Sequence, residues 1–387
     1  MTGFPHARLS DLCEINIGRT PSRSVREYWG PGSSWMSIAD MNQGRSLSKT
    51  KEQITDAAIR DTNIRLVPAG SVLLSFKLSI GKVGIAAKPL FTNEAIASLP
   101  IIQPDRLVPE FLYWALQSMD LVAGQDRAVM GLTLNKAKLS QLLVPIPPLT
   151  EQLRIAAILD QADALRAKRR EALAQLDSLT QSIFIEMFGD PVKNPKGWEI
   201  LPFGDQFRSV RYGTGSPPPY VEEGVPFIRA TNIKAGRVSA KDLRSISIKE
   251  ALKLAKCRVK RGDLIVVRSG VNTGDCAVIP AEYDGACAAF DLIVDIDYVN
   301  GVFYGYLINS AVGKKILEPL TRRAAQPHLN AEQLQTIPFI SPPPALRTEF
   351  VKRIDAIEKV RATHFRALDA LDSLFASLQH RAFRGEL

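Results

Sequence analysis

The sequence predicts an α+β protein with two mixed α/β domains in tandem, separated and joined by two long helices that form an antiparallel coiled coil with pseudo-twofold symmetry. Three observations lead to this fold class. The second half of the 387-residue chain repeats the first, and each half ends in a long stretch without glycine or proline. Each half begins with short apolar runs typical of strands, together with one helical segment.

The repeat is clearest in the tails of the two halves. Residues that match lie 195 positions apart without any gap: Leu134-Asn135 and Leu329-Asn330, Leu139 and Leu334, Asp160 and Asp355, Arg166 and Arg361, Leu176-Asp177-Ser178-Leu179 and Leu371-Asp372-Ser373-Leu374. Chance is a poor explanation for such a run. A weaker match upstream relates residues 35–41 to residues 227–233, and Gly44-Arg45 to Gly236-Arg237.

Each tail is predicted to be one long helix. The first covers residues 150–188, because prolines at 145, 147 and 148 exclude a helix upstream and Gly189 and Pro191 end it. Thr150 is the expected N-cap. The second follows Pro342, Pro343 and Pro344 and ends at Gly385. About 37 residues at 1.5 Å each span roughly 55 Å, a length suited to a spacer.

Apolar residues at alternating spacings of three and four form a heptad stripe on both helices. The predicted helix–helix residues are Leu159, Leu173, Leu176 and Ile183 in the first helix, and Ile354, Ile357, Leu368, Leu371, Phe375 and Leu378 in the second. The middle of the stripe is basic, with Arg166 and Arg169 matched by Arg361 and His364. This basic middle either sets the register of the helices or faces a partner protein or DNA. The alternative is a pair of ordinary amphipathic helices packed on their own domains, and the helix length argues against it.

The front part of each half is a mixed domain. Residues 34–41, 71–76, 83–87 and 97–102 are predicted strands and residues 110–122 a helix in the first half. In the second half, residues 226–231, 263–267, 276–279 and 292–296 are predicted strands and residues 301–315 a helix. The pattern is too irregular for a doubly wound sheet, and no G-x-G-x-x-G follows a strand.

Polar and basic side chains gather in the predicted loops. Such residues contact phosphates and base edges, and the net charge of +9 is compatible with a polyanionic partner. Taken singly, each fits a solvated turn equally well, so their collective placement carries the hypothesis. The candidates are Arg19, Thr20, Ser22, Arg23, Arg26, Lys77, Lys82 and Arg127 in the first half, and Arg211, Tyr212, Thr214, Arg229, Asn232, Arg268, Asn272, Thr273, Arg322, Gln326 and His328 in the second.

Signals of catalysis and of metal binding are missing from the sequence. The four cysteines include no C-x-x-C pair and are expected to be reduced thiols, and the four histidines are scattered. Ser216-Pro217-Pro218-Pro219-Tyr220 lacks the Asn or Asp of a methyltransferase motif, and there is neither a phosphate-binding loop nor a cluster of carboxylates. No signal peptide or long apolar run occurs. We therefore expect a cytoplasmic binding protein without catalytic or metal-ligating residues.

Several segments resemble the specificity subunits of type I restriction–modification systems. Leu134-Asn135, followed by residues 144–152 and by Leu159-Asp160, is similar to the end of a target recognition domain in that family. Residues 187–191 resemble the exit from its central helix, residues 382–387 its C-terminal end, and Gly18–Ser22 with Trp35 its early domain pattern. The second copy departs at residues 344–347, where Pro-Ala-Leu-Arg replaces Leu-Thr-Glu-Gln.

The resemblance implies target recognition domains at residues 1–149 and 191–344, a central long helix at 150–190 and a C-terminal long helix at 345–387. Each domain would read half of a bipartite double-stranded DNA site. The helices would act as a ruler, with half-sites centred about one DNA turn, roughly 34 Å, apart. Two methyltransferase subunits would bind along the helices, and restriction subunits would join them. This chain would hold no cofactor; S-adenosylmethionine, ATP and Mg²⁺, as well as a flipped base, would be bound by the partners.

Four other functions are compatible with parts of the sequence. A fused methyltransferase or nuclease would be an enzyme in its own right. A coiled-coil scaffold would not read DNA, and another kind of DNA-binding protein would lack the partner subunits. An RNA-binding protein is disfavoured because paired aromatic stacking motifs are missing.

Overall fold

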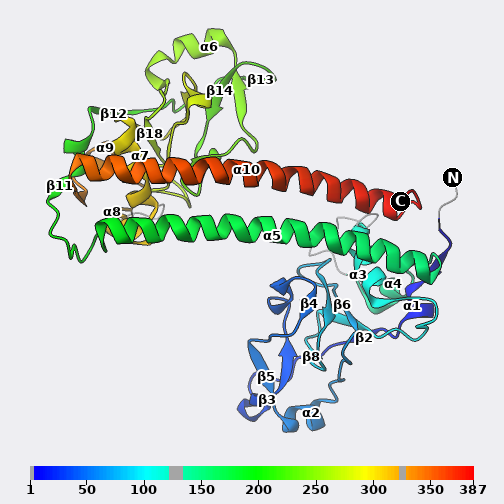
Figure 1. Ribbon diagram of the computed structural model, residues 1–387. Coiled ribbons are helices and arrows are strands. Elements are labelled where there is room, and N and C mark those ends of the chain that lie inside the picture. The colour runs from blue at the N-terminus through cyan, green and yellow to red at the C-terminus, as the bar shows by residue number, and fades with distance from the viewer. Residues whose placement is uncertain (1–3, 122–133, 322–327) are drawn as a thin grey trace. The chain divides into compact units, whose positions relative to one another are not determined.

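The computed structural model describes residues 4–121, 134–321 and 328–387. The chain forms two compact units: unit 1 comprises Met1–Glu171 and Phe365–Leu387, and unit 2 comprises Ala172–His364. The long helices α5 (Leu149–Phe188) and α10 (Pro344–Ala382) therefore each contribute one end to each unit (Figure 1). The predicted pair of long helices and the mixed α/β domains are confirmed.

Unit 1 contains a five-stranded sheet in the order β2-β9-β6-β7-β4 and a three-stranded sheet in the order β5-β3-β8. Within the larger sheet β2, β9, β6 and β7 pair antiparallel, and β4 runs parallel to β7. In sheet order the strands are Asn16–Ile17, Ile96–Leu99, Val72–Ser75, Val83–Ala86 and Ser46–Leu47, then Glu52–Ile54, Trp29–Met36 and Phe91–Thr92. The helices of the front domain are α1 (Leu9–Leu12), α2 (Asp56–Thr62), α3 (Pro109–Ser118) and α4 (Lys136–Ser140).

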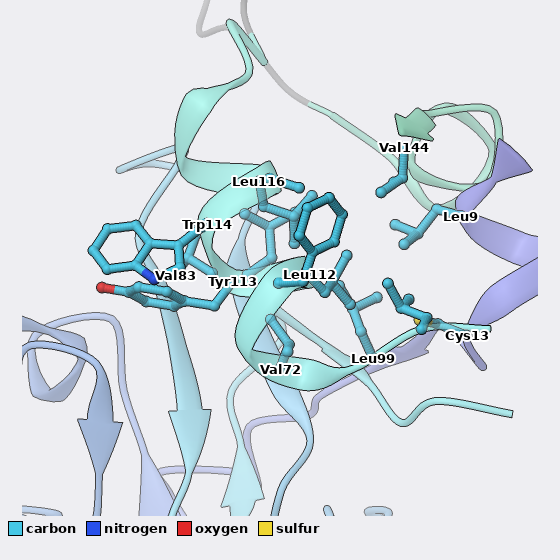
Figure 2. Packing of buried hydrophobic residues seen from close by; sticks show 14 of the residues in the cluster. Leu9, Cys13, Val72, Val83, Leu99, Leu112, Tyr113, Trp114, Leu116 and Val144 are labelled. Carbon is cyan, nitrogen blue, oxygen red and sulfur yellow. The ribbon is translucent and has the colours of Figure 1, made fainter. Parts of the chain in front are cut away.

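The main core of unit 1 lies between α3 and the larger sheet. Figure 2 shows residues of α3, among them Leu112 and Trp114, packed with residues of the strands and of α1. Val72 and Val83 supply the β-branched side chains that a buried strand favours. Phe375 of α10 closes the core from the helix side, with its ring centroid 5.4 Å from that of Trp114. The long helices are therefore part of the domain core.

Unit 2 repeats this plan with its own strands. Its sheets have the orders β12-β21-β18-β19, β13-β17-β14-β20 and β15-β16. In that order the strands are Ser209–Tyr212, Leu292–Asp295, Leu264–Val266 and Cys276–Val278, then Tyr220–Val221, Arg244–Ile246, Val225–Ile228 and Cys287–Ala288, then Ile233–Lys234 and Arg237–Val238. The helices are α6 (Ile248–Lys253), α7 (Tyr298–Asn309), α8 (Ala311–Thr321) and α9 (Ala331–Gln335).

Aromatic side chains join α7 of unit 2 to the long helices. Phe184 and Phe188 of α5 contact Phe303 of α7 and Phe350 of α10, with ring centroids 4.9 to 5.8 Å apart. All four side chains are buried in one cluster. Because aromatic rings bury large apolar areas, this cluster fixes α7 firmly on the helix pair.

A short strand pair closes the front domain of each unit. β1 (His6–Arg8) pairs antiparallel with β10 (Leu143–Pro145), and β11 (Ile200–Pro202) pairs with β22 (Pro338–Ile340). The repeated asparagines lie just before these closing strands: the side chain of Asn135 caps α4 and that of Asn330 caps α9. The Leu-Asn repeat thus reflects a helix start that needs a side-chain acceptor.

Several predicted element ends differ from the observed ones. The strands predicted at 34–41 and 226–231 stop at Met36 and Ile228, and 3₁₀ turns follow at Asp40–Gln43 and Ala230–Asn232. In the first turn the Asp40 carboxylate accepts from the amide and hydroxyl of Ser37, which favours a turn over a strand.

The other differences concern helices. The helix predicted at 301–315 is two helices, because Ser310 is extended and its hydroxyl accepts from the amide of Gly313 at the start of α8. Thr150 is not the N-cap but lies in the first turn of α5, and Pro344 is the first residue of α10 instead of preceding it. Proline suits a first helical turn, where its missing N–H costs nothing.

Within each unit an ion pair links the two long helices. In unit 1, Arg166 Nε donates to Asp372 Oδ1 at 2.5 Å, and the guanidinium carbon lies 4.2 Å from the Phe375 ring centroid. In unit 2, Arg361 binds Asp177, and its side chain is only 2% exposed. Arg166 and Arg361, two residues of the basic middle of the heptad stripe, thus pair with acidic residues of the other helix, which supports the register-setting interpretation.

The predicted helix–helix residues are all buried or partly buried. Leu159 and Phe375 belong to the core of unit 1, and Ile354 and Ile357 to the core of unit 2. Leu173 is buried, and the remaining members are partly buried: Leu176, Ile183, Leu368, Leu371 and Leu378.

Candidate nucleic-acid interface

Polar loops lie at one end of the strands in the sheet β12-β21-β18-β19 of unit 2. We call this end of the strands the edge of the sheet. β12 and β18 end at this edge, and β21 and β19 begin there, because the four strands pair antiparallel. The chain therefore places Tyr212, Arg268 and Phe290 close together from three separate segments. His328, which precedes α9, joins them through an isolated bridge with Ser269.

The guanidinium of Arg268 is the centre of this group. Its carbon lies 4.7 Å from the Tyr212 ring centroid and 4.2 Å from that of Phe290, and both rings are more than two-fifths exposed. Nη2 is 2.8 Å from His328 Nε2; since a guanidinium only donates, the imidazole nitrogen is the acceptor. Stacking and this hydrogen bond fix the plane of the guanidinium before any ligand arrives. We call Arg268, Tyr212, Phe290 and His328 the Arg268 cluster.

A buried carboxyl lies beneath the Arg268 cluster. Asp291 is 3% exposed, and its Oδ1 accepts from the backbone amide of Arg268 at 3.3 Å. Burial raises the pKa of Asp291 from 3.8 to about 6, and the amide and charge of Arg268 offset only part of that rise. The backbone of the loop that carries Arg268 therefore donates a hydrogen bond to the Asp291 carboxyl, whose charged form is destabilised by burial.

The matching edge in unit 1 carries the corresponding loops. β2 and β6 end there, and β9 and β7 begin there. Thr20 follows β2 and its hydroxyl binds Glu94, which precedes β9. Lys77 and Lys82 lie in the loop between β6 and β7, and Lys82 Nζ donates to the carbonyl of Ile38 at 3.2 Å. This edge is basic and polar, and the loop that follows β2 also carries a stacked guanidinium, that of Arg23 over the Trp29 ring, whose N–H groups donate to Glu52.

A glycine follows the first strand at each edge. An added Cβ at Gly18 would lie 2.2 Å from the carbonyl oxygen of Asn93, and one at Gly213 would lie 1.6 Å from that of Ala289. Neither position tolerates a side chain, because the neighbouring backbone cannot move aside cheaply. The close approach brings the segments after β2 and β12 against the loops before β9 and β21.

The basic residues between β2 and β3 are mostly held by the domain itself. Arg23 makes two hydrogen bonds to Glu52 and stacks on Trp29 at 3.8 Å, and this pairing holds the pKa of the Glu52 carboxyl below its usual range. Arg19 donates to the carbonyl of Thr62 at 2.5 Å. Ser22 and Arg26 are exposed.

Three candidates in unit 2 have structural contacts. Arg211 donates to the carbonyls of Lys256 and Arg258 and to the Asp263 carboxylate. Arg229 Nη2 donates to the carbonyl of Asp242 at 2.5 Å. Asn232 is fully buried, and its amide group donates to two backbone carbonyls. Asn232 therefore stabilises a turn and has no surface to offer a ligand.

Three more candidates in the second half lie at the sheet edge. Thr214 follows β12, and Asn272 and Thr273 lie in the loop between β18 and β19. Arg127, Arg322 and Gln326 fall outside the described residues.

Sequence reasoning missed three residues at these edges. Leu78 and Val271 are apolar yet almost fully exposed, and Phe290 forms one face of the Arg268 cluster. An isolated apolar residue between polar ones, as in Lys77-Leu78-Ser79, was the available signal. It is weak, because single exposed apolar residues are common on protein surfaces.

All four cysteines are unpaired and buried. Burial raises the pKa of Cys13 and of Cys276 to about 12, so these thiols are poor nucleophiles at neutral pH. Across residues 4–121, 134–321 and 328–387, no helix has both the length and the apolar composition needed to cross a bilayer.

Comparison with known proteins gives a consistent result. Residues 2–175 match the family described as type I restriction modification DNA specificity domain. The specificity subunit of the type I restriction enzyme MjaIX from Methanocaldococcus jannaschii is 29% identical over 252 residues, which cover 59% of this chain and 58% of that subunit. The EcoBI specificity subunit from Escherichia coli is 22% identical over 334 residues, covering 78% and 70%.

The fold also has a solved counterpart. The crystal structure of the type I restriction-modification S subunit from M. genitalium has a TM-score of 0.62 at 14% identity and covers 99% of each chain. The match to the MjaIX subunit spans less than two thirds of that protein. The structural match shows a shared fold over nearly the whole chain.

Proposed function

We propose that the chain is a specificity subunit of a type I restriction–modification system and that it reads a two-part DNA sequence, one part with each unit. One observation supports this most strongly. Both units place polar and basic loops at the same edge of their main sheet, although the front domains share little sequence. A surface that is built twice in one chain suits a target with two half-sites.

The chemistry of these edges suits base and phosphate contacts. In unit 2 the stacked Arg268 presents a fixed donor fork, the geometry that pairs bidentately with guanine. Asn272 and Thr273 flank it, and Lys77 and Lys82 take the corresponding place in unit 1. Arg211 and Asn232 do not belong to the reading surface, because their polar groups bind backbone carbonyls of the domain itself.

The helices also carry a repeated surface for partners. Leu165 and Leu374 are about half exposed in unit 1, and their counterparts 195 positions away, Val360 and Leu179, are equally exposed in unit 2. Apolar residues exposed on a long helix favour a protein partner. Two copies of one surface support two copies of one partner, a methyltransferase subunit, to which restriction subunits would add.

The chemistry of the system would then lie in the partners. S-adenosylmethionine would be bound by the methyltransferase subunits, and ATP and Mg²⁺ by the restriction subunits. This chain would supply sequence recognition and the platform for assembly, and it would not be an enzyme.

The function is tested by co-expressing the chain with a type I methyltransferase subunit that forms a complex with it and mapping methylated bases in plasmid DNA. We expect one asymmetric motif with two specified parts and a fixed gap. Exchange of residues 191–344 for the matching domain of a relative should change one part only. A stable complex that leaves no motif would favour the non-reading scaffold instead.

The repeated surface for partners on the long helices is tested separately by paired substitutions. Leu165→Asp with Leu374→Asp should remove one of two methyltransferase copies, as native mass spectrometry would measure. Leu179→Asp with Val360→Asp should remove the other copy. Leu153 is the control: it is exposed, but its counterpart is polar Thr348, so Leu153→Asp should leave both copies bound. Loss of both copies in either pair would contradict two independent sites.

A further inference from the structure

The loop between the two central strands of each main sheet carries an apolar residue at its tip. Leu78 lies between β6 and β7 and is 90% exposed, and Val271 lies between β18 and β19 and is fully exposed. These are the most exposed large apolar side chains recorded among the described residues of the two units. An apolar side chain in water gains nothing for the isolated fold, so its repetition at one place in both units needs an explanation.

The backbone at Leu78 strengthens the case. Its φ is +62°, a left-handed conformation that leucine rarely adopts and that asparagine or glycine adopts readily. The structure therefore keeps a strained and exposed leucine where a polar residue would be more stable. Strain of this kind persists where function requires the side chain.

Both loops are closed at their base, so the tips are held away from the sheets. The hydroxyl of Ser75 donates to the carbonyl of Ser79 at 2.5 Å and accepts from the amide of Lys82 at 2.9 Å. In unit 2, Val267 exchanges two backbone hydrogen bonds of 2.8 Å with Asp275 and Gly274. A short closed loop loses little conformational entropy when its tip binds a ligand.

We propose that Leu78 and Val271 each contact the C5-methyl group of a thymine in the half-site read by their unit. The proposal rests on the proposed function and names part of its recognition chemistry. Cations and polar residues occur in the same loops: Lys77 and Lys82 near Leu78 in sequence, and Arg268 and Asn272 near Val271. Such neighbours favour the polyanionic DNA groove over an apolar protein groove. The thymine methyl is the apolar group that the major groove offers.

The test uses the complex of the full chain with its methyltransferase partner, bound to a duplex that carries the mapped target. Each thymine of the target is replaced in turn by uracil, which removes only the methyl group. In the wild type, at least one replacement in each half-site should lower affinity about four-fold, the factor expected for one buried methyl. A half-site without any A·T pair would overturn the proposal for its unit.

The variants Leu78→Asn and Val271→Thr assign the contacts. Leu78→Asn should abolish the uracil effect in one half-site, leave the other unchanged, and keep or raise the melting temperature because asparagine relieves the strained φ. Val271→Thr, which keeps the side-chain volume, should weaken the uracil effect in the other half-site. Leu66→Asn in unit 1, also at an exposed leucine, should leave both effects intact.

Uracil effects that are the same in the wild type and in both variants would overturn the proposal while leaving DNA reading established. A variant that loses the methyltransferase subunit, with DNA discrimination retained, would assign the tip to a protein contact instead and also overturn it. If the wild-type complex itself reads no sequence, the proposed function fails first, and methylation mapping shows this independently.

Discussion

Replacement of the buried Asp291 should stabilise unit 2 at neutral pH. Asp291 is 3% exposed, and burial raises its pKa from 3.8 to about 6. Its backbone partner, the amide of Arg268, can donate equally well to an asparagine oxygen. Asp291→Asn therefore keeps the hydrogen bond and removes the unfavourable charge.

The size and direction of the effect follow from the pKa. In the folded state the carboxyl holds its proton up to about pH 6, whereas in the unfolded chain it releases it near pH 3.8. The folded state thus binds more protons in this window, and the wild type loses stability as the pH rises from about 4 to about 6. A tenfold change in acidity is worth about 1.4 kcal/mol, so the loss amounts to about 3 kcal/mol. Asp291→Asn should not lose this stability. Its free energy of unfolding should therefore exceed that of the wild type by about 3 kcal/mol above pH 6, and by little near pH 4.

Hydrogen exchange of the β18 and β21 amides measures the stability of unit 2 separately from that of unit 1. The measurement compares wild type and Asp291→Asn between pH 4 and pH 8. Asp284→Asn is the matched control, because Asp284 also accepts from a backbone amide, that of Arg261, but is exposed. If Asp291→Asn follows the wild type at every pH, or destabilises unit 2 above pH 6, burial does not control this carboxyl.

Two further predictions concern repeated features. Gly213→Ala should destabilise unit 2 by at least about 2 kcal/mol in denaturant titrations, since its Cβ would lie 1.6 Å from the carbonyl oxygen of Ala289. Asp177→Asn should cost about 2 kcal/mol because it weakens the main partner of the buried Arg361. Asp372→Asn, at the matching position of the repeat, should cost about 1 kcal/mol, since its arginine partner is more exposed.

These two predictions have built-in comparisons. Gly215→Ala is the control for the glycine, because its Cβ would lie 3.8 Å from Phe290, an ordinary contact, and the change should stay within about 0.5 kcal/mol. For the carboxylates the two units serve as references for each other. Equal costs of Asp177→Asn and Asp372→Asn would show that burial of the arginine does not set the strength of the pair.

The long-range plan of the fold was predictable because it depends on periodicity. Proline and glycine bound both long helices within a few residues, and Leu159 and Ile354 of the heptad stripe are buried. Element ends were less predictable, since they depend on single side chains. Asp40 ends a strand by capping a turn, and Ser310 divides a helix in two, and neither residue is diagnostic in the sequence.

The candidate site was predictable only at the level of loops. Arg268 and His328 lie 60 residues apart and meet because two sheet connections converge at one edge, which no local pattern reveals. Conversely, Arg23 and Asn232 look like ligand-binding residues in sequence, yet their polar groups are used by Glu52 and by backbone carbonyls. Polar residue types indicate where hydrogen bonds form, but only the fold decides between an internal partner and an external one.

The repeat explains how two unlike front domains fit one type of helix. Asp160 of α5 accepts from Trp114 Nε1 at 2.8 Å, and its counterpart Asp355 of α10 accepts from the hydroxyl of Tyr298 at 2.7 Å. A carboxylate accepts from indole or phenol alike, so the helix stays constant while the donor on the domain changes.

The first turns of α5 and α10, where the two copies of the repeat differ, also hold their front domains through different polar groups. Gln152 and its counterpart Arg347 differ in type, yet both are buried and both bind their own front domain. Acceptors and donors on the long helices thus tolerate exchange of the domain that they hold. A different front domain needs only one suitable polar group at each helix contact, so the front parts can differ while the tails stay alike.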